Sequence, residues 1–249
     1  MYINHPAVVG FRRRFAPQIR FLQQRLTPEG YLGVHLTVGA LVIVLATWCF
    51  GAIVEDLLTH DPLVIFDQQV ARWFHNHATP AVTQAANIVT FFGSPLFLTG
   101  ASVLYGATLL VQGLRYRLLS LALTMAGGSL LNIVLKGLFH RPRPWSDLKA
   151  LSLLWSSYSF PSGHVMGSTL FYLFVAFLIA AAAKSWHWRV SAILTAFMLV
   201  LLIALSRIYL GMHYLSDVLG AAAAGLAWLA VCVTAVDTLR RYREQRQSS

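Results

Sequence analysis

Charged side chains are scarce in this chain, and acidic ones are the scarcest. Only 11% of the 249 residues are Asp, Glu, Lys or Arg, and nine of these are acidic. Apolar residues make up 57% of the chain, and the mean hydropathy is +0.63. A soluble globular domain carries about 25% charged and about 45–50% apolar residues. This balance excludes an ordinary soluble domain and predicts an integral membrane protein.

Cysteine is nearly absent, and no spacing of cysteine with histidine suits a metal ion. Cys49 and Cys232 both lie in apolar runs, where we interpret them as small buried hydrophobes. Ser/Gly/Pro linkers, low-complexity tracts and internal repeats are also absent, which predicts a single compact unit. Although the net charge is +10, the chain carries no nucleic-acid-binding motif. We therefore expect no metal, no cofactor and no nucleic acid partner.

Six apolar runs are long enough to cross about 30 Å of hydrocarbon, which takes about 20 helical residues each. They cover residues 34–54, 89–111, 117–137, 164–183, 190–208 and 215–236. Residues 62–77 are apolar on one side only and predict an interfacial helix, with Trp73 and Phe74 at headgroup level. The expected fold is therefore all-α: a polytopic membrane protein with six transmembrane helices in a bundle.

The first 32 residues interleave arginines with large apolar residues, which predicts an amphipathic helix on the membrane surface rather than a cleavable signal peptide. We divide the chain into this basic amphipathic segment (1–32), the first transmembrane helix with the interfacial segment (33–84), a core (85–236) and a basic tail (237–249).

Loop charges predict how the bundle is oriented. Six spans put both termini on one side, which would carry thirteen Lys and Arg residues and three acidic residues, whereas the other side would carry six of each. Because cytoplasmic loops are enriched in Lys and Arg, we expect both termini in the cytoplasm. The opposite, external face would be periplasmic if the membrane is a bacterial inner membrane.

Three short polar clusters lie at the ends of spans on that external face. Ionisable groups at membrane depth are costly and usually mark function. The clusters are Lys136 with Arg143 (KGLFHRPRP), Ser162 with Gly163 and His164 (PSGH), and Arg207 with His213 and Asp217 (SRIYLGMHYLSD).

The first cluster closes the third span. Lys136 ends the predicted helix, and the prolines that follow prevent the helix from continuing. Arginine suits two-point recognition of a phosphate, and lysine acts as a point charge, so Lys136 and Arg143 would bind phosphate. Arg141 and His140 are secondary candidates. Ordinary snorkelling of cations at a helix end is the alternative.

The second cluster opens the fourth span. Ser162 is the expected helix cap, and the free backbone N–H groups at such a start favour an anion. Ser162 and Gly163 would bind phosphate oxygens, and His164 could donate a proton. The alternative is a plain helix cap beside an interfacial histidine.

The third cluster covers the turn between the fifth and sixth spans. Arg207 ends one helix, and we expect His213 to begin the next, where Asp217 would share its helix face. A carboxylate bonded to one imidazole nitrogen leaves the other nitrogen as a nucleophile. The alternative is a structural His–Asp pair whose side chains only hydrogen-bond to each other. Together, the clusters supply cations, a nucleophile and an acid for one phosphoryl transfer.

These residues resemble the type 2 phosphatidic acid phosphatase family, which shares its active-site pattern with vanadium haloperoxidases and bacterial acid phosphatases. The family pattern is KxxxxxxRP, PSGH and SRxxxxxHxxxD, and every specified position matches between Lys136 and Asp217. The resemblance covers roughly residues 85–236, which we identify as the family core.

The resemblance implies catalytic roles for His213, His164 and Asp217. His213 would attack phosphorus to form a phosphohistidine, Asp217 would orient it, and His164 would protonate the leaving oxygen. Lys136, Arg143, Arg207, Ser162 and the Gly163 N–H would hold the phosphate oxygens, without a metal. The implied partner is a phospholipid or isoprenyl phosphate in the membrane.

The sequence leaves several functions open. Phosphatidate, phosphatidylglycerol phosphate and undecaprenyl pyrophosphate are all candidate substrates, and the phosphoryl group could pass to a second lipid instead of water. A vanadium haloperoxidase is disfavoured by the six spans. A transporter that uses the polar cavity for binding alone would not need the His213–Asp217 arrangement. The oligomeric state is unknown.

Overall fold

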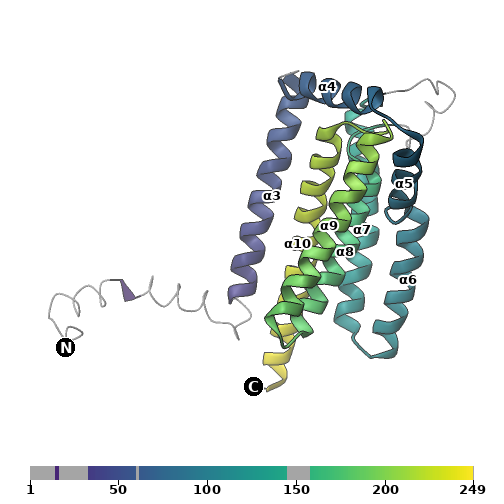
Figure 1. The fold of residues 1–249 in the computed structure, drawn as a ribbon. Coiled ribbons are helices and arrows are strands. Elements are labelled where there is room, and N and C mark those ends of the chain that lie inside the picture. The colour runs from purple at the N-terminus through teal and green to yellow at the C-terminus, as the bar shows by residue number, and fades with distance from the viewer. Residues whose placement is uncertain (1–14, 17–32, 60–61, 145–157, 249) are drawn as a thin grey trace, which may run out of the picture.

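The computed structural model describes residues 15–16, 33–59, 62–144 and 158–248. Its elements run from α3 to α10 along the chain (Figure 1). They are α3 (Val34–Thr59), α4 (Pro62–Asn76), α5 (Pro80–Phe91), α6 (Pro95–Val111), α7 (Arg115–Phe139), α8 (Gly163–Ala182), α9 (Trp186–Tyr209) and α10 (Leu215–Ser248). No strand occurs among the described residues, so the all-α prediction is confirmed. The predicted amphipathic helix of residues 1–32 lies almost wholly outside them.

Six spans are confirmed, because the described chain has six helical segments long and apolar enough to cross a membrane. The second span differs from the prediction: it covers Pro80–Val111 and consists of two helices, α5 and α6. Ser94 and Pro95 explain the break, since the Ser94 hydroxyl accepts the Phe97 N–H at 3.3 Å and proline starts the new helix. α5 therefore brings its own polar side chains beside the other spans.

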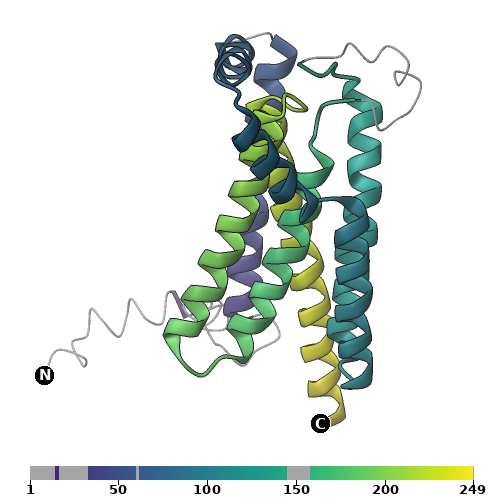
Figure 2. The same ribbon diagram turned by 45° about the vertical axis from the view of Figure 1, so that its right-hand side comes forward.

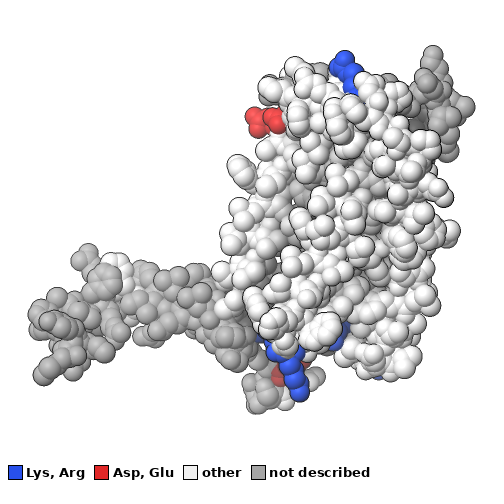
Figure 3. All heavy atoms as spheres, in the orientation of Figure 1, with Lys and Arg blue, Asp and Glu red and all other residues white. Residues whose placement is uncertain are grey.

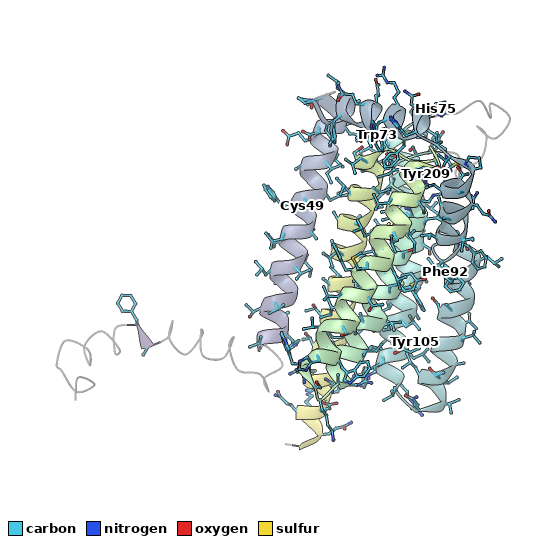
Figure 4. All side chains as sticks on the ribbon, viewed as in Figure 1. Cys49, Trp73, His75, Phe92, Tyr105 and Tyr209 are labelled. Carbon is cyan, nitrogen blue, oxygen red and sulfur yellow. The ribbon has the colours of Figure 1, made fainter. Side chains whose placement is uncertain are left out.

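Helix α4 lies across one end of the bundle and does not span it (Figure 1). Ile65, Phe66 and Trp73 are exposed, whereas Asp67 and Ala71 face inward and are buried. Trp73 and His75 lie at the same end as Tyr209, the last residue of α9 (Figure 4). The structure thus shows a helix with one exposed apolar side in this segment and adds a buried acid to it, while its place at the membrane interface stays a prediction.

The start of α3 and the end of α10 lie at one end of the bundle, opposite α4 (Figures 1 and 2). The core packs α8 against α10 around Val165, Met166, Leu170 and Phe174. The contact is close at Gly225, where an added Cβ would lie 3.3 Å from the Met166 carbonyl oxygen. Small residues allow such approach between membrane helices, where packing rather than hydrophobic burial drives association.

On the face that Figure 3 shows, the outer surface between the two ends is almost free of charge. Large apolar side chains are exposed along it, as expected of helices that contact lipid. Cys49 on α3 is one of these outward-facing residues (Figure 4), so our prediction that it is buried was wrong. A lipid-facing position is as apolar as a core, and hydropathy does not distinguish them. Cys232 is buried, as predicted.

Candidate active site

The three predicted clusters meet at the end of the bundle that α4 covers. Lys136 lies on the last turns of α7, Ser162 and His164 at the start of α8, and Arg207 on the last turn of α9. His164 lies within electrostatic range of Arg207, His213, Arg143 and Lys136. Clusters separated by tens of residues therefore share one site.

The turn that carries His213 is held by Asp217. The Tyr214 N–H donates to Asp217 Oδ2 at 2.8 Å, which satisfies a free backbone donor at the start of α10. Helix α10 begins at Leu215, so His213 lies in the turn before it and our prediction that His213 begins the helix was wrong. Because the Asp217 carboxylate accepts the Tyr214 N–H, the helix begins after His213 and not at it.

His213 and Asp217 are neighbours without a hydrogen bond between them. Nδ1 of His213 lies 3.6 Å from Asp217 Oδ2, beyond hydrogen-bond distance, and has no other partner among the described residues. His213 is only 2% exposed. Burial lowers its pKa to about 4, although Asp217 acts in the opposite direction. The imidazole is therefore neutral at pH 7, as a nucleophile requires.

Asp217 is occupied by other donors, chiefly Arg141. Arg141 Nη1 donates to Asp217 Oδ1 at 2.6 Å, and the Ser159 hydroxyl donates to Oδ2. The guanidinium also stacks on the Tyr214 ring, 4.3 Å from its centroid. Burial acts to lower the pKa of Arg141, but Asp217 and Asp67 outweigh it and raise the pKa. Arg141, a secondary candidate in the sequence, is thus part of the structure that holds Asp217.

Asp67 on α4 completes this network, and sequence reasoning missed it. Its Oδ2 accepts from Arg141 Nη2 at 2.8 Å and from the Ser216 hydroxyl, and its Oδ1 accepts the Ser216 N–H at 2.9 Å. Asp67 and Asp217 are both fully buried. The available signal is a lone acid in a half-apolar segment, and Asp67 is one of the six acidic residues in the charge count of the external face. The ion pair and the hydrogen bonds of Asp67 link α4 to the site.

Ser162 and Gly163 form the anion-facing start of α8. Ser162 is the N-cap residue, as predicted, but its side chain makes no capping hydrogen bond. Its buried hydroxyl has no partner among the described residues, while its N–H donates to the Asp217 carbonyl at 3.2 Å. The first bond inside the helix is Met166 N–H to Ser162 O, which leaves the N–H groups before it directed out of the helix end.

Asn132 on α7 fixes this helix start. Its amide nitrogen donates to the Pro161 carbonyl at 3.3 Å. A Cβ added to Gly163 would lie 3.2 Å from Asn132 Oδ1, tighter than an ordinary contact. A side chain at position 163 would therefore require the Asn132 amide to shift by a few tenths of an ångström, and that amide also holds the Pro161 carbonyl.

Three cations surround the same point. Arg207 is 7% exposed, and its Nη1 donates to Thr90 Oγ1 on α5 at 3.2 Å, while Nε has no partner in the described part of the chain. Lys136 is 8% exposed and donates to the Tyr158 carbonyl. Arg143 is half-buried. Buried cations are costly unless an anion compensates them, so the site suits an oxyanion.

The donor set has no arrangement of metal-ligand type. Across the described ranges, no group of three or more His, Cys, Asp or Glu side chains could hold a metal ion. The site can instead hold an oxyanion with Lys136, Arg143 and Arg207, with His213 and His164 beside it. This arrangement permits attack by one imidazole and proton donation by the other.

Replacing Asp67 by Asn should destabilise the protein and lower its activity. The change leaves Arg141 buried with one charge partner, and breaking a buried ion pair costs about 3–5 kcal/mol. We expect a clearly lower midpoint of thermal unfolding and a lower kcat, because Asp217 loses its fixed orientation. Glu55→Gln, which removes one exposed acid at the same end, is the matched control. Equal effects of the two changes would contradict a positioning role for Asp67.

Known proteins are similar to this chain in sequence and in fold. A family model described as the PAP2 superfamily matches residues 117–241. The chain is 30% identical over 168 residues to phosphatidylglycerophosphatase B of Bacillus subtilis (strain 168), covering 67% of this chain and 81% of that protein. It resembles the crystal structure of a transmembrane PAP2-type phosphatidylglycerolphosphate phosphatase from Bacillus subtilis, with a TM-score of 0.62 and 27% identity over 78% of this chain and 94% of that one. Aquifex aeolicus LpxE matches with a TM-score of 0.49 and 21% identity over 66% and 93%.

Proposed function

The chain belongs to the PAP2 superfamily and is a membrane lipid phosphatase, and we propose that it hydrolyses the terminal phosphate of a membrane lipid through a phosphohistidine at His213. The observation that carries the mechanism is the buried, neutral His213 beside Asp217 and a group of cations. Phosphatidylglycerol phosphate is the first candidate substrate, because both the Bacillus subtilis sequence match and the Bacillus subtilis structure match are named for it.

In the first step, His213 attacks phosphorus and the bond from phosphorus to the lipid oxygen breaks. The developing charge on the phosphate oxygens is held by Lys136, Arg143, Arg207, the Ser162 hydroxyl and the Gly163 N–H. Fixed donors of this kind stabilise a transition state because they need no reorganisation. His164 gives its proton to the leaving oxygen, so the lipid departs as an alcohol.

In the second step, water attacks the phosphohistidine and restores His213. His164, now neutral, accepts the proton of that water, so the enzyme returns to its starting protonation state. Asp217 does not react. It lies 3.6 Å from His213 Nδ1, where its charge stabilises the imidazole as it becomes cationic.

We place the active site on the external face of a bacterial inner membrane, with both termini in the cytoplasm. The excess of Lys and Arg on the loops at the terminal end supports this orientation. The substrate phosphate would then lie at headgroup level beneath α4, with the acyl chains in the surrounding bilayer.

A panel of lipid phosphates presented to the purified chain tests the proposed activity. Phosphatidylglycerol phosphate, phosphatidate and undecaprenyl pyrophosphate are compared in detergent micelles, without added metal and with a chelator. We expect phosphate release in the presence of the chelator, with the highest kcat/KM on one of these lipids. Analysis of the lipid products separates transfer to water from transfer to a second lipid. No phosphate release from any of them would refute the proposal.

The pKa of His213 predicts a dependence of stability on pH. Because the pKa is about 4 in the folded protein and about 6.5 in an unfolded chain, the unfolded state binds more protons between these values. Stability should therefore fall as the pH drops from about 6.5 to about 4, by roughly 3 kcal/mol from this group. Thermal unfolding of the wild type and of His213→Gln at pH 7 and pH 4.5 measures it. The stability advantage of the wild type should shrink at the lower pH, and an unchanged difference would contradict a neutral buried imidazole.

A further inference from the structure

A cavity lies at the end of the bundle opposite the active site, where the chain termini emerge from the spans. It has a volume of about 500 Å³ and lies between the first turns of α7, the last turns of α8 and the second half of α10. Its lining on α7 begins at Arg115, whereas Lys136 of the active site is some 20 residues further along the same helix. At 1.5 Å per residue this is roughly 30 Å, so the cavity is separate from the active site.

The deeper walls of this cavity are apolar. Phe174, Phe177 and Leu178 of α8 face Val233 and Val236 of α10 across it. Phe177 is exposed at the bundle surface, so the apolar wall continues onto the face that contacts lipid. A hydrocarbon chain could therefore enter from the bilayer without leaving an apolar environment.

The rim of the cavity carries more positive than negative charge. Arg240 and Arg241 on α10 are paired with Asp237 at 2.6 and 2.7 Å, and Glu244 contacts Arg240. Arg115 and Arg117 on α7 have no acidic partner in the described part of the chain. Figure 3 shows basic side chains gathered at this end of the molecule. Among the described residues of the rim, the positive charges that have no acidic partner are thus those of Arg115 and Arg117 on α7.

The first turn of α7 is a poor place for two cations unless an anion is near. The helix has no acidic residue in its first turn, and Leu114 at the cap position supplies no side-chain hydrogen bond. The positive end of the helix dipole therefore adds to the charges of Arg115 and Arg117. The Arg115 N–H donates to the Gly113 carbonyl, but the N–H groups of Tyr116 and Arg117 are free among the described residues and, with the two guanidinium groups, favour a phosphate.

Ser120 gives independent support, one turn deeper in the cavity. Its side chain lines the cavity and is 6% exposed, yet its hydroxyl oxygen has no hydrogen-bond partner in the described ranges. A buried hydroxyl without a partner is unfavourable, and such groups are almost always hydrogen-bonded in folded proteins. The hydroxyl is placed to donate to a headgroup oxygen held by the arginines.

We propose that this cavity binds one anionic phospholipid of the leaflet at the terminal end of the bundle. Arg115, Arg117 and the first turn of α7 hold the phosphate, the Ser120 hydroxyl donates to a headgroup oxygen, and an acyl chain lies against Phe174 and Phe177. The apolar wall and its continuity with the bilayer favour a lipid over a free phosphate. Basic pockets between membrane helices are suited to such headgroups.

Thermal unfolding of the purified full chain in detergent tests the proposal. Phosphatidylserine is titrated as the probe because it is anionic and has no terminal phosphate to hydrolyse, and phosphatidylcholine is the neutral comparison. We expect phosphatidylserine alone to raise the unfolding midpoint to a plateau, since a ligand of the folded state stabilises it. In Arg115→Gln/Arg117→Gln, the lipid concentration that gives half of this rise should increase about tenfold. Glycerol 3-phosphate is added in a third arm to represent the free headgroup.

The matched control is Lys184→Gln/Arg189→Gln, which removes two exposed cations at the same end of the bundle, outside the cavity. It should keep the response of the wild type. Equal losses in the two double variants, an equal rise with phosphatidylcholine, or an equal rise with glycerol 3-phosphate would each overturn the proposal. If Arg115→Gln/Arg117→Gln does not fold, Arg117→Gln alone should show a smaller loss in the same direction, and an unchanged response would count against the site. Lipid phosphatase activity at the distant active site is measured in each variant and should be retained.

Discussion

His213→Ala should reduce phosphate release from lipid substrates by about 10⁴-fold or more. The change removes the only group that we assign as nucleophile, and loss of a nucleophile typically removes most of an enzyme's rate enhancement. The cations that hold the phosphate would remain, so the variant should still bind substrate. Phosphate release by the purified variant in detergent micelles measures the effect. His187→Ala, an exposed histidine at the far end of α9, is the matched control and should retain wild-type activity.

Two outcomes of this experiment would contradict the assignment. Retained turnover in His213→Ala would show that another group attacks phosphorus. A transporter that uses the cavity only for binding would show flux that is insensitive to His213→Ala but sensitive to Arg207→Ala, because Arg207 contributes charge and not chemistry. Measuring phosphate release and lipid flux in both variants separates the enzyme from the transporter.

His164→Ala should lower activity by an amount that depends on the leaving group. A lipid alkoxide needs a proton as it departs, and general acid catalysis typically contributes about 10²–10⁴-fold. 4-Nitrophenolate is stable without a proton, so its release in the phosphorylation step needs no acid. We therefore expect a loss of that size on a lipid phosphate and a much smaller loss in the initial burst of 4-nitrophenol from 4-nitrophenyl phosphate.

Rapid-mixing kinetics with the two substrates on the same enzyme preparation measure this difference. The comparison is internally controlled, because a folding defect would lower the rates with both substrates equally. Equal losses on the two substrates would show that His164 contributes through packing or charge and does not donate a proton. Its place on the first turn of α8, near Arg207 and His213, is what motivates the assignment.

The sequence predicted the spans and the three clusters because each depends on local features. Apolar runs identify spans by length, and cations or histidines at their ends stand out against a chain with 11% charged residues. The clusters were predicted to converge because successive spans cross the membrane in opposite directions, which places all three helix ends on the same face. Local patterns predict His213 and His164 at helix ends and Asp217 four residues after His213, and the structure brings all three to the same end of the bundle.

The parts that the sequence did not predict depend on contacts between distant residues. Asp67 is hydrogen-bonded to Arg141, which lies 74 residues away in the sequence, and to Ser216, which lies 149 residues away. No local sequence pattern predicts either pair. The break of the second span at Ser94 was not predicted, because hydropathy measures how apolar a segment is and does not detect where a helix ends. His213 was placed in a helix because the interval of four residues to Asp217 fits a helix, whereas the carboxylate folds back to the Tyr214 N–H.

The central claim is that the phosphoryl group passes through His213, and trapping it there is the most direct measurement. His164→Ala is mixed with 4-nitrophenyl phosphate, because the first step then needs no acid while the second step lacks its base. The reaction is stopped in alkaline denaturant, which preserves phosphohistidine, and the peptides are analysed by mass spectrometry. We expect one phosphoryl group on the peptide that contains His213, and none in His164→Ala/His213→Ala. Turnover by the wild type with no phosphoryl group trapped on His213, or with the group on another residue, would contradict the mechanism.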